Sequence, residues 1–170
     1  MKIETFINEK SIQSRISQLA EEISQDFQGE DLVILGILNG SFMFCSDLVR
    51  RIETPQLVDF LSVKSYEGTK STGSVEVYLD TLIDLENKNV LIVEDIVDTG
   101  LTLKNLTNLL KERNPKSLKL ASLLYKPSKN KYKTPIDYLG FEIEDKFVVG
   151  YGLDLDGLYR ELPYIGVISD

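Results

Sequence analysis

The stretch "VLIVEDIVDTGLTL", Val90 to Leu103, decides the fold and points to one end of a strand. It opens with four apolar residues, which is the composition of a buried strand. The carboxylates of Glu94, Asp95 and Asp98 follow within five residues, before an apolar segment of helical character. Because burying that much negative charge in a core is costly, we expect these side chains to face a cleft.

Apolar segments of strand length alternate with helical segments along the rest of the chain. The predicted strands are 31–38, 57–65, 90–93, 118–125, 138–143, 147–150 and 165–168. The predicted helices are 11–27, 42–52 and 101–113, and the segment 66–77 is predicted to be a mobile loop that leads into a strand. This alternation is typical of an α/β fold with a mostly parallel sheet flanked by helices. Ligands of such folds bind beyond the carboxyl ends of the strands, where the acidic residues would lie.

Composition narrows the classes of function. The 170 residues favour a single domain, 1–170, and the net charge of −8 with a pI near 4.7 argues against nucleic-acid binding. The absence of histidine excludes a histidine base and histidine-ligated metals. With Cys45 as the one cysteine, a bound metal is expected to be hard and oxygen-liganded, such as Mg²⁺.

Two further observations concern location. No apolar run reaches the roughly 18 residues that a membrane span needs. The first residues, "MKIETFINEK", lack the apolar centre of a signal peptide. We therefore expect a cytoplasmic protein that does not bind a membrane.

The acidic stretch has two interpretations. In the simpler one, Asp98 or Thr99 caps the following helix and the acids lie in a solvated loop. In the other, the adjacent acids Glu94 and Asp95 suit sugar hydroxyls or a Mg²⁺ bound to them. The segment "DTGLT" then offers backbone amides and hydroxyls to a phosphate. The second interpretation, which we favour, describes a site for a phosphorylated sugar.

Five segments, in order, make the resemblance specific. "VLIVEDIVDTGLTL" resembles the phosphoribosyl-pyrophosphate motif of the type I phosphoribosyltransferases. Four others resemble the hypoxanthine (6-oxopurine) branch: "LNGSFMFCSDL" its pyrophosphate loop, "SYEGTKSTG" its lid, "LLYKPSK" its base-recognising lysine, and "PIDYLGFEIEDKFVVGYGLDLDGLYRELPYIGVI" its purine pocket. The resemblance covers most of the chain after residue 31 and implies that family's fold, with a small hood built from the termini.

The resemblance implies transfer of a 5-phosphoribosyl group from phosphoribosyl pyrophosphate to hypoxanthine, and to guanine, with Mg²⁺ as cofactor. Asp98 would handle the proton at N7 of the purine. Glu94 and Asp95 would hold the ribose 2- and 3-hydroxyls, which also ligate one Mg²⁺, and Asp154 would bind a second Mg²⁺, directly or through water. The residues implied for phosphoribosyl pyrophosphate are Glu94, Asp95, Asp98, Thr99, Gly100, Leu101, Thr102, Asn39, Gly40, Ser65, Tyr66 and Arg160. Ser65 and Tyr66 would close over the reacting centre and exclude water.

The purine side would be formed by Lys126, Phe147, Val148 and Asp154. Lys126 would donate to O6, which selects against a 6-amino base. Phe147 would stack on the ring, and Val148 would offer backbone groups. Without the resemblance, Lys126 would be interpreted as a surface cation, Phe147 as a core residue and Arg160 as an exposed charge at a helix end.

Several alternatives stay open at this point. Relatives often have Lys or Arg where this chain has Asn39, so the charge there is in doubt although backbone contact is expected. Guanine or xanthine could be the preferred base. A different class would be an RNA-binding regulator on the same fold, and a third would be a phospho-acceptor signalling domain. Family members usually form homodimers or homotetramers, and the sequence does not decide between them.

Overall fold

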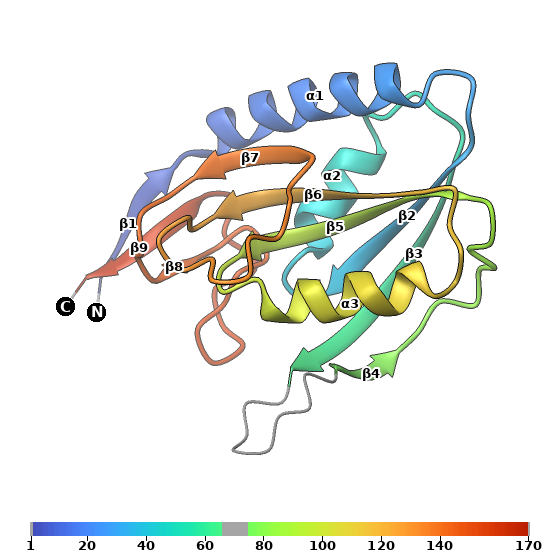
Figure 1. Ribbon diagram of the computed structural model, residues 1–170. Coiled ribbons are helices and arrows are strands. Elements are labelled where there is room, and N and C mark those ends of the chain that lie inside the picture. The colour runs from blue at the N-terminus through green and yellow to red at the C-terminus, as the bar shows by residue number, and fades with distance from the viewer. Residues whose placement is uncertain (1, 66–74, 170) are drawn as a thin grey trace.

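In the computed structural model, which describes residues 2–65 and 75–169, three helices cover a six-stranded sheet, and a three-stranded sheet stands at one end (Figure 1). The strands of the large sheet, in spatial order, are β4 (Val75–Leu79), β3 (Gln56–Ser65), β2 (Leu32–Leu38), β5 (Asn89–Val97), β6 (Ser117–Tyr125) and β7 (Tyr138–Glu142). Every neighbouring pair is parallel except β3 with β4. The predicted α/β class is confirmed.

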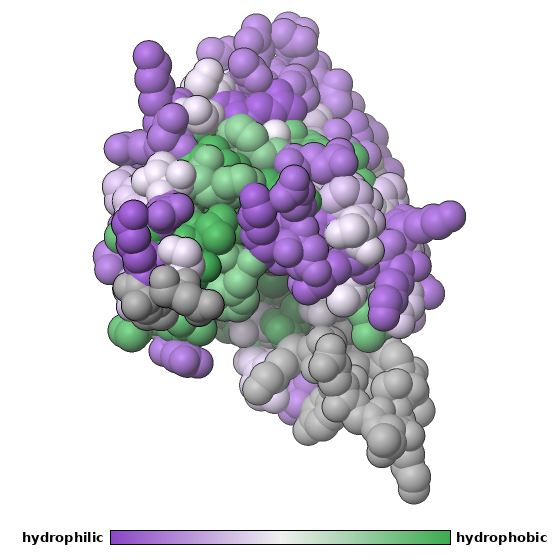
Figure 2. All heavy atoms as spheres, turned by 90° about the vertical axis from the view of Figure 1, so that its left-hand side faces the viewer, coloured by the Kyte–Doolittle hydropathy of each residue, from purple (hydrophilic) through white to green (hydrophobic). Residues whose placement is uncertain are grey.

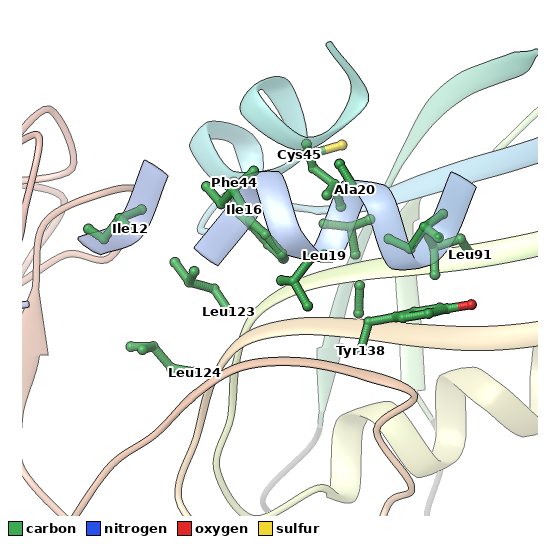
Figure 3. Close-up of a cluster of buried hydrophobic side chains, with 14 of the residues drawn as sticks. Ile12, Ile16, Leu19, Ala20, Phe44, Cys45, Leu91, Leu123, Leu124 and Tyr138 are labelled. Carbon is green, nitrogen blue, oxygen red and sulfur yellow. The ribbon is translucent and has the colours of Figure 1, made fainter. Parts of the chain in front are cut away.

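Alternate residues of the central strands pack on opposite faces of the large sheet. On β2, Ile34 packs with α1 (Glu9–Asp26) and α2 (Phe42–Val49), whereas Leu35 packs with α3 (Leu101–Lys111). Figure 3 shows the first of these two clusters, between the sheet and the pair α1 and α2. Because both faces are covered, the central strands need apolar residues at every position, which is why they stand out in the sequence.

Helix α1 follows directly from its sequence. The side chain of Asn8 accepts a hydrogen bond from the backbone N–H of Ser11 at 2.9 Å and caps the first turn. The buried side chains of α1 recur at helical spacing, and they are Ile12, Ile16, Leu19, Ala20 and Ile23. The opposite face of α1 is polar, and no helix in the described ranges is long and apolar enough to cross a membrane.

The small sheet, here called the hood, joins the two ends of the chain. Its strands β1 (Lys2–Ile7), β9 (Ile165–Ser169) and β8 (Val148–Val149) are antiparallel, and the termini lie side by side (Figure 1). The expected hood is confirmed, but β1 was not among the predicted strands. The residues of β1 are largely exposed, and its partner lies at the far end of the chain, so no local pattern marks it.

Strand β5 is longer than its apolar run. Pairing with β2 stops at Val93, but pairing with β6 continues to Val97. The predicted end at Val93 is therefore wrong, and Glu94 and Asp95 lie within the strand. Asp98 is the first residue beyond it. The added hydrogen bonds to β6 hold these acids in fixed positions at the carboxyl-terminal edge of the sheet.

Candidate active site

A cleft opens where β2 and β5 end, beside the hood. Its cavity has a volume of about 320 Å³. The lining residues are Ile37, Leu38, Gly40, Val63, Glu94, Asp95, Ile96, Val97, Asp98, Thr99, Gly100, Thr102, Leu103, Asp154 and Arg160. Figure 2 looks onto this end of the sheet and shows apolar side chains surrounded by polar ones. The structure thus gathers most of the predicted sugar-phosphate residues around one cavity.

Two other surface depressions are larger but chemically simpler. One, of about 460 Å³, lies at the opposite, amino-terminal edge of the sheet and contains the ion pair between Glu30 and Lys116. The other, of about 710 Å³, lies between α1 and the segment 51–55. Every acidic residue that lines either depression is exposed. Size alone therefore does not identify the functional site.

Glu94 and Asp95, here called the acid pair, are only partly exposed in the cleft. Burial raises the pKa of Glu94 well above its usual value, and the charge of Asp95 and a hydrogen bond with it act in the same direction. Among the described side chains, no Lys or Arg forms an ion pair with either acid. The acid pair is therefore suited to a cation or to hydroxyl donors from a ligand.

The loop of residues 39–41, here called the Gly40 loop, presses its backbone against the acid pair. A Cβ atom on Gly40 would lie 1.6 Å from Oδ2 of Asp95, so no side chain fits there. The peptide bond between Leu38 and Asn39 is cis. Ser41 is fully buried, and its Oγ has no hydrogen-bond partner among the described residues. Helix α2 starts immediately after it, so a helix N-terminus, which favours anions, lies at the cavity.

Asp98 combines burial with an unused acceptor. Its Oδ1 is buried without a hydrogen-bond partner in the described parts of the chain, and its Oδ2 lies 3.8 Å from Nζ of Lys129. An unsatisfied buried acceptor costs about 1–3 kcal/mol, a cost that a donor on a ligand would remove. Gly100, two residues on, has φ +82°, and a Cβ there would lie 2.7 Å from both Asn130 Oδ1 and Thr134 Oγ1.

The capping interpretation of Asp98 is wrong. Helix α3 begins at Leu101, its N-cap residue is Gly100, and no side chain makes a capping hydrogen bond. Thr99 Oγ1 only accepts a long bond, 3.4 Å, from the backbone N–H of Leu101. The carboxylate of Asp98 is therefore free to serve the cavity that it borders.

Strand register places Lys126 beside Asp98. Val97 on β5 is paired with Tyr125 on β6, and Asp98 and Lys126 are the residues that directly follow this pair. The backbone N–H of Lys126 donates to Val97 O at 3.0 Å. Lys126 is only 6% exposed, and its ammonium lies 3.5 Å from Asp145 Oδ1. The surface-cation interpretation of Lys126 is therefore wrong.

Sequence reasoning missed the charged neighbours of this lysine. Lys129 Nζ lies 3.0 Å from Asp145 Oδ1. Four charged side chains of alternating sign therefore lie next to one another in space, in the order Lys126, Asp145, Lys129 and Asp98. A hydrogen bond from Lys129 lowers the pKa of Asp145. Two lysines three residues apart in "KPSK" were a usable signal. Nothing local marks Asp145, because its partners come from another loop.

The segment between β8 and β9 contributes Asp154 and Arg160 to the cleft. Arg160 Nη1 donates to Gly152 O at 2.6 Å, and Nη2 lies 2.9 Å from Asp154 Oδ1. Asp154 Oδ2 accepts the backbone N–H of Gly157 at 2.7 Å. Arg160 is thus held across a loop, and its interpretation as an exposed charge at a helix end is wrong.

Five further predicted residues do not line this cavity, and they are Asn39, Leu101, Lys126, Phe147 and Val148. Ser65 is the last residue of β3, and Tyr66 lies outside the described residues. Val148 is buried, whereas the side chain of Phe147 is 57% exposed, so the core interpretation of Phe147 is wrong.

The donor set in the cleft fits a hard cation that shares its coordination with a ligand. Among the described residues, no group of three Asp, Glu, His or Cys side chains is close enough to hold a metal alone. Mg²⁺ is usually bound by one or two carboxylates together with waters and substrate oxygens. Glu94, Asp95 and Asp154 border one cavity and supply carboxylates of this kind.

Comparison with known proteins agrees with this geometry. A family model described as phosphoribosyl transferase domain matches residues 5–156. The chain is 48% identical over 167 residues to a hypoxanthine-guanine phosphoribosyltransferase of Staphylococcus aureus, covering 98% of this chain and 93% of that protein. A Dictyostelium discoideum protein of the same name is 46% identical over 175 residues, covering 100% and 97%. A crystal structure of a Bacillus anthracis hypoxanthine-guanine phosphoribosyltransferase has a TM-score of 0.94 at 41% identity, covering 99% and 100%.

Proposed function

This chain belongs to the phosphoribosyl transferase domain family, and from that premise we propose that it is a hypoxanthine-guanine phosphoribosyltransferase of purine salvage. The enzyme joins N9 of hypoxanthine or guanine to C1 of the ribose of phosphoribosyl pyrophosphate. The bond from C1 to pyrophosphate breaks, the proton at N7 of the purine is released, and IMP or GMP forms. Relatives that carry the activity in their names align over almost the whole chain.

The acid pair holds the sugar in this proposal. Glu94 and Asp95 accept hydrogen bonds from the 2- and 3-hydroxyls of the ribose, which would also ligate one Mg²⁺, and Asp154 would hold a second Mg²⁺, directly or through water. When bound, the metal neutralises charge on the pyrophosphate that leaves. The raised pKa of Glu94 supports this role, because two carboxylates in one partly buried site gain from any cation or donor between them.

Three parts of the cleft hold the phosphates. The backbone amides of Asp98 to Thr102, at the start of α3, bind the 5-phosphate. The Gly40 loop, with Asn39 acting through its backbone, and Arg160 contact the pyrophosphate. Ser65 and Tyr66 close over the reacting centre, which protects the positively charged ribose from water.

Asp98 is the catalytic base, and it provides the observation that carries the proposal. Its buried Oδ1 lacks a partner among the described residues, it borders the cavity that contains the acid pair, and the residue before it, Val97, accepts the backbone N–H of Lys126. A carboxylate in this position can take the proton from N7 while Lys126 donates to O6 of the same ring. The exposed ring of Phe147 stacks on the purine, and backbone groups of Val148 contact its edge.

One assay tests this function. The protein is mixed with Mg²⁺ and phosphoribosyl pyrophosphate, and nucleotide formation is followed with hypoxanthine, guanine, xanthine or adenine. We expect conversion of hypoxanthine and guanine, loss of activity with a chelator, and no use of adenine because its 6-amino group faces the Lys126 donor. Absence of nucleotide with every purine would refute the function, and equal use of adenine would refute the role of Lys126.

The assembly and location of the enzyme are also proposals. Leu57, Val58, Tyr78 and Leu79 on β3 and β4 are exposed, which favours a homodimer or homotetramer over a monomer. Light scattering after size-exclusion chromatography measures the state directly, and a monomer at micromolar concentration would contradict it. We expect the enzyme to act in the cytoplasm, and fractionation of cells that produce it tests that location.

A further inference from the structure

A cluster of polar side chains outside the cleft connects α2 to the turn that follows β8. Asp47 on α2 accepts hydrogen bonds from Gln13 Nε2 at 2.9 Å, from the hydroxyl of Tyr151 and from Arg50 Nη2. Arg51 completes the cluster by donating to Gln13 Oε1 at 2.6 Å. The side chain of Asp47 is only 15% exposed, so its bonds with Gln13 and Tyr151 are partly shielded from water, whereas Arg50 lies at the surface. The roles proposed above use none of these five residues.

Tyr151 is the part of this cluster that leads toward the cleft. It is 4% exposed and has φ +51°, a conformation that non-glycine residues adopt rarely. It lies in the turn of residues 150–153, here called the hood turn, and its N–H donates to Leu162 O at 2.8 Å. The cost of that backbone conformation must be met by surrounding contacts, and the bond to Asp47 is one of them.

The hood turn touches the Gly40 loop directly. A Cβ on Gly152 would lie 2.0 Å from the carbonyl oxygen of Gly40, so the two backbones are in contact. Gly152 also exchanges two hydrogen bonds with Arg160: its N–H donates to Arg160 O at 2.9 Å, and its carbonyl accepts from Arg160 Nη1 at 2.6 Å. Gly40 in turn lies against Asp95. A shift of the hood turn would therefore move groups on the pyrophosphate side of the cleft.

We propose that Asp47 and Tyr151 are a positioning pair that fixes the hood turn on the Gly40 loop and thereby sets the geometry of the pyrophosphate subsite. The inference rests on the proposed function for the identity of the ligand, but it assigns a role to residues that do not touch it. The purine side depends on it less, because Lys126 is held by β5 and β6 instead.

The protonation of both partners suits a permanent bond. Burial of Asp47 opposes its charge, but hydrogen bonds from Gln13, Tyr151 and Arg50 outweigh burial and keep its pKa below the usual value. Burial and the neighbouring carboxylate raise the pKa of Tyr151. The acceptor therefore stays ionised and the donor stays protonated across the neutral range.

The test compares two tyrosines that each donate to a carboxylate. Tyr151→Phe removes the bond to Asp47. Tyr138→Phe is the matched control, because it removes a bond of 2.6 Å to Asp26 from an equally buried ring. Figure 3 shows Tyr138 beside the buried side chains of α1. Binding of pyrophosphate in the presence of Mg²⁺ is measured by calorimetry, and KM is measured for phosphoribosyl pyrophosphate and for hypoxanthine.

We expect Tyr151→Phe to weaken pyrophosphate binding and raise KM for phosphoribosyl pyrophosphate about tenfold, the effect of one lost positioning contact of about 1.4 kcal/mol. The KM for hypoxanthine should stay within twofold, and Tyr138→Phe should change Tm only. Equal loss on both substrates, no loss, or the same loss in Tyr138→Phe would overturn the inference. Asp47→Ala should reproduce Tyr151→Phe, and the double variant should be no worse than either single one.

The calorimetric measurement separates the two proposals. If the wild-type protein binds pyrophosphate but makes no nucleotide, the proposed function fails while the positioning pair is still judged by the binding ratio of the variants. If the wild-type protein makes nucleotide and all variants bind pyrophosphate equally, the positioning pair fails alone. Additive effects of Asp47→Ala and Tyr151→Phe would also overturn it, because a pair that acts through one bond cannot lose that bond twice.

Discussion

Acidic side chains pair with lysines at the amino-terminal edge of the large sheet, where its parallel strands begin, whereas at the carboxyl-terminal edge, where the strands end, the acid pair has no Lys or Arg partner among the described residues. At the amino-terminal edge, Glu30 pairs with Lys116 at 2.7 Å, and Asp26 accepts from both Lys119 and Tyr138. At the carboxyl-terminal edge, two carboxylates are adjacent in the acid pair, and Asp98 keeps a buried oxygen without a partner among the described residues. Both edges belong to one set of strands, so the contrast does not come from the fold.

Under the proposed function, the carboxyl-terminal edge gives up stability for binding. Hydrogen bonds from Tyr138 and then Lys119 lower the pKa of Asp26, and one from Lys116 lowers that of Glu30. Burial and a like charge instead raise the pKa of Glu94. A satisfied pair has little left to offer a ligand, but an unsatisfied acid gains from one. A substitution at the carboxyl-terminal edge should therefore differ in its effect on kcat, KM or Tm from a matched substitution at the amino-terminal edge.

The largest effect is expected from Asp98→Asn. An amide cannot accept the N7 proton, so kcat should fall about 100-fold or more, while phosphoribosyl pyrophosphate still binds. The control at the other edge is Asp137→Asn, which alters an acid that accepts the backbone N–H of Leu120 at 2.8 Å, and its kcat should stay within twofold. Steady-state kinetics and calorimetry give both quantities. Unchanged kcat in Asp98→Asn would refute its role as base.

The second effect is expected from Lys126→Ala. Loss of the charged donor to O6 should weaken hypoxanthine binding by about 2 kcal/mol, or roughly 30-fold in KM, with a much smaller change for phosphoribosyl pyrophosphate. Lys119→Ala, which removes the lysine beside Asp26 and Tyr138, should leave both KM values within twofold. Equal loss for both substrates in Lys126→Ala would contradict a role in base recognition.

Sequence alone predicted the part of the molecule in which local pattern and burial coincide. The apolar runs of β2 and β5 and the spacing of Ile12 to Ile23 on α1 gave those elements, because both faces of the sheet must be covered. Strand β1 escaped, since its exposed residues carry no pattern and its partner is β9. The continuation of β5 to Val97 also escaped, because it depends on pairing with β6.

The same division holds for the site. The acid pair and Asp98 stand in one short stretch, so their gathering at one cavity was predictable. The bridge of Asp145 and Lys129 between Lys126 and Asp98 was not, because it joins two loops that only the folded chain brings together. Apolar pattern also misassigns Phe147, because Val148 and Val149 after it are buried while its own ring is exposed.

The third effect concerns stability and has opposite signs at the two edges. Because the native pKa of Glu94 is raised, the native protein loses stability as pH rises through that pKa. Glu94→Gln avoids this loss, so at pH 8 in EDTA its Tm should rise about 2–4 °C, equivalent to about 1 kcal/mol. The gain should shrink as pH falls through that pKa and the wild-type carboxyl becomes protonated. Thermal unfolding measures both Tm values. A lower Tm for Glu94→Gln than for the wild type at pH 8 would contradict the destabilisation of the ionised Glu94 beside Asp95.

The smallest effect is expected from Glu30→Gln at the other edge. Hydrogen bonds from Lys116 and Asn89 lower the pKa of Glu30, so its stabilisation is present above the unfolded pKa and is lost as pH falls through the native pKa. The pair is exposed, and the variant should therefore lose less than about 2 °C of Tm at pH 8, and the loss should vanish once pH has fallen below that native pKa. Thermal unfolding beside Glu94→Gln measures both signs in one experiment. Changes of the same sign would mean that the two edges do not differ in the way their charges are satisfied.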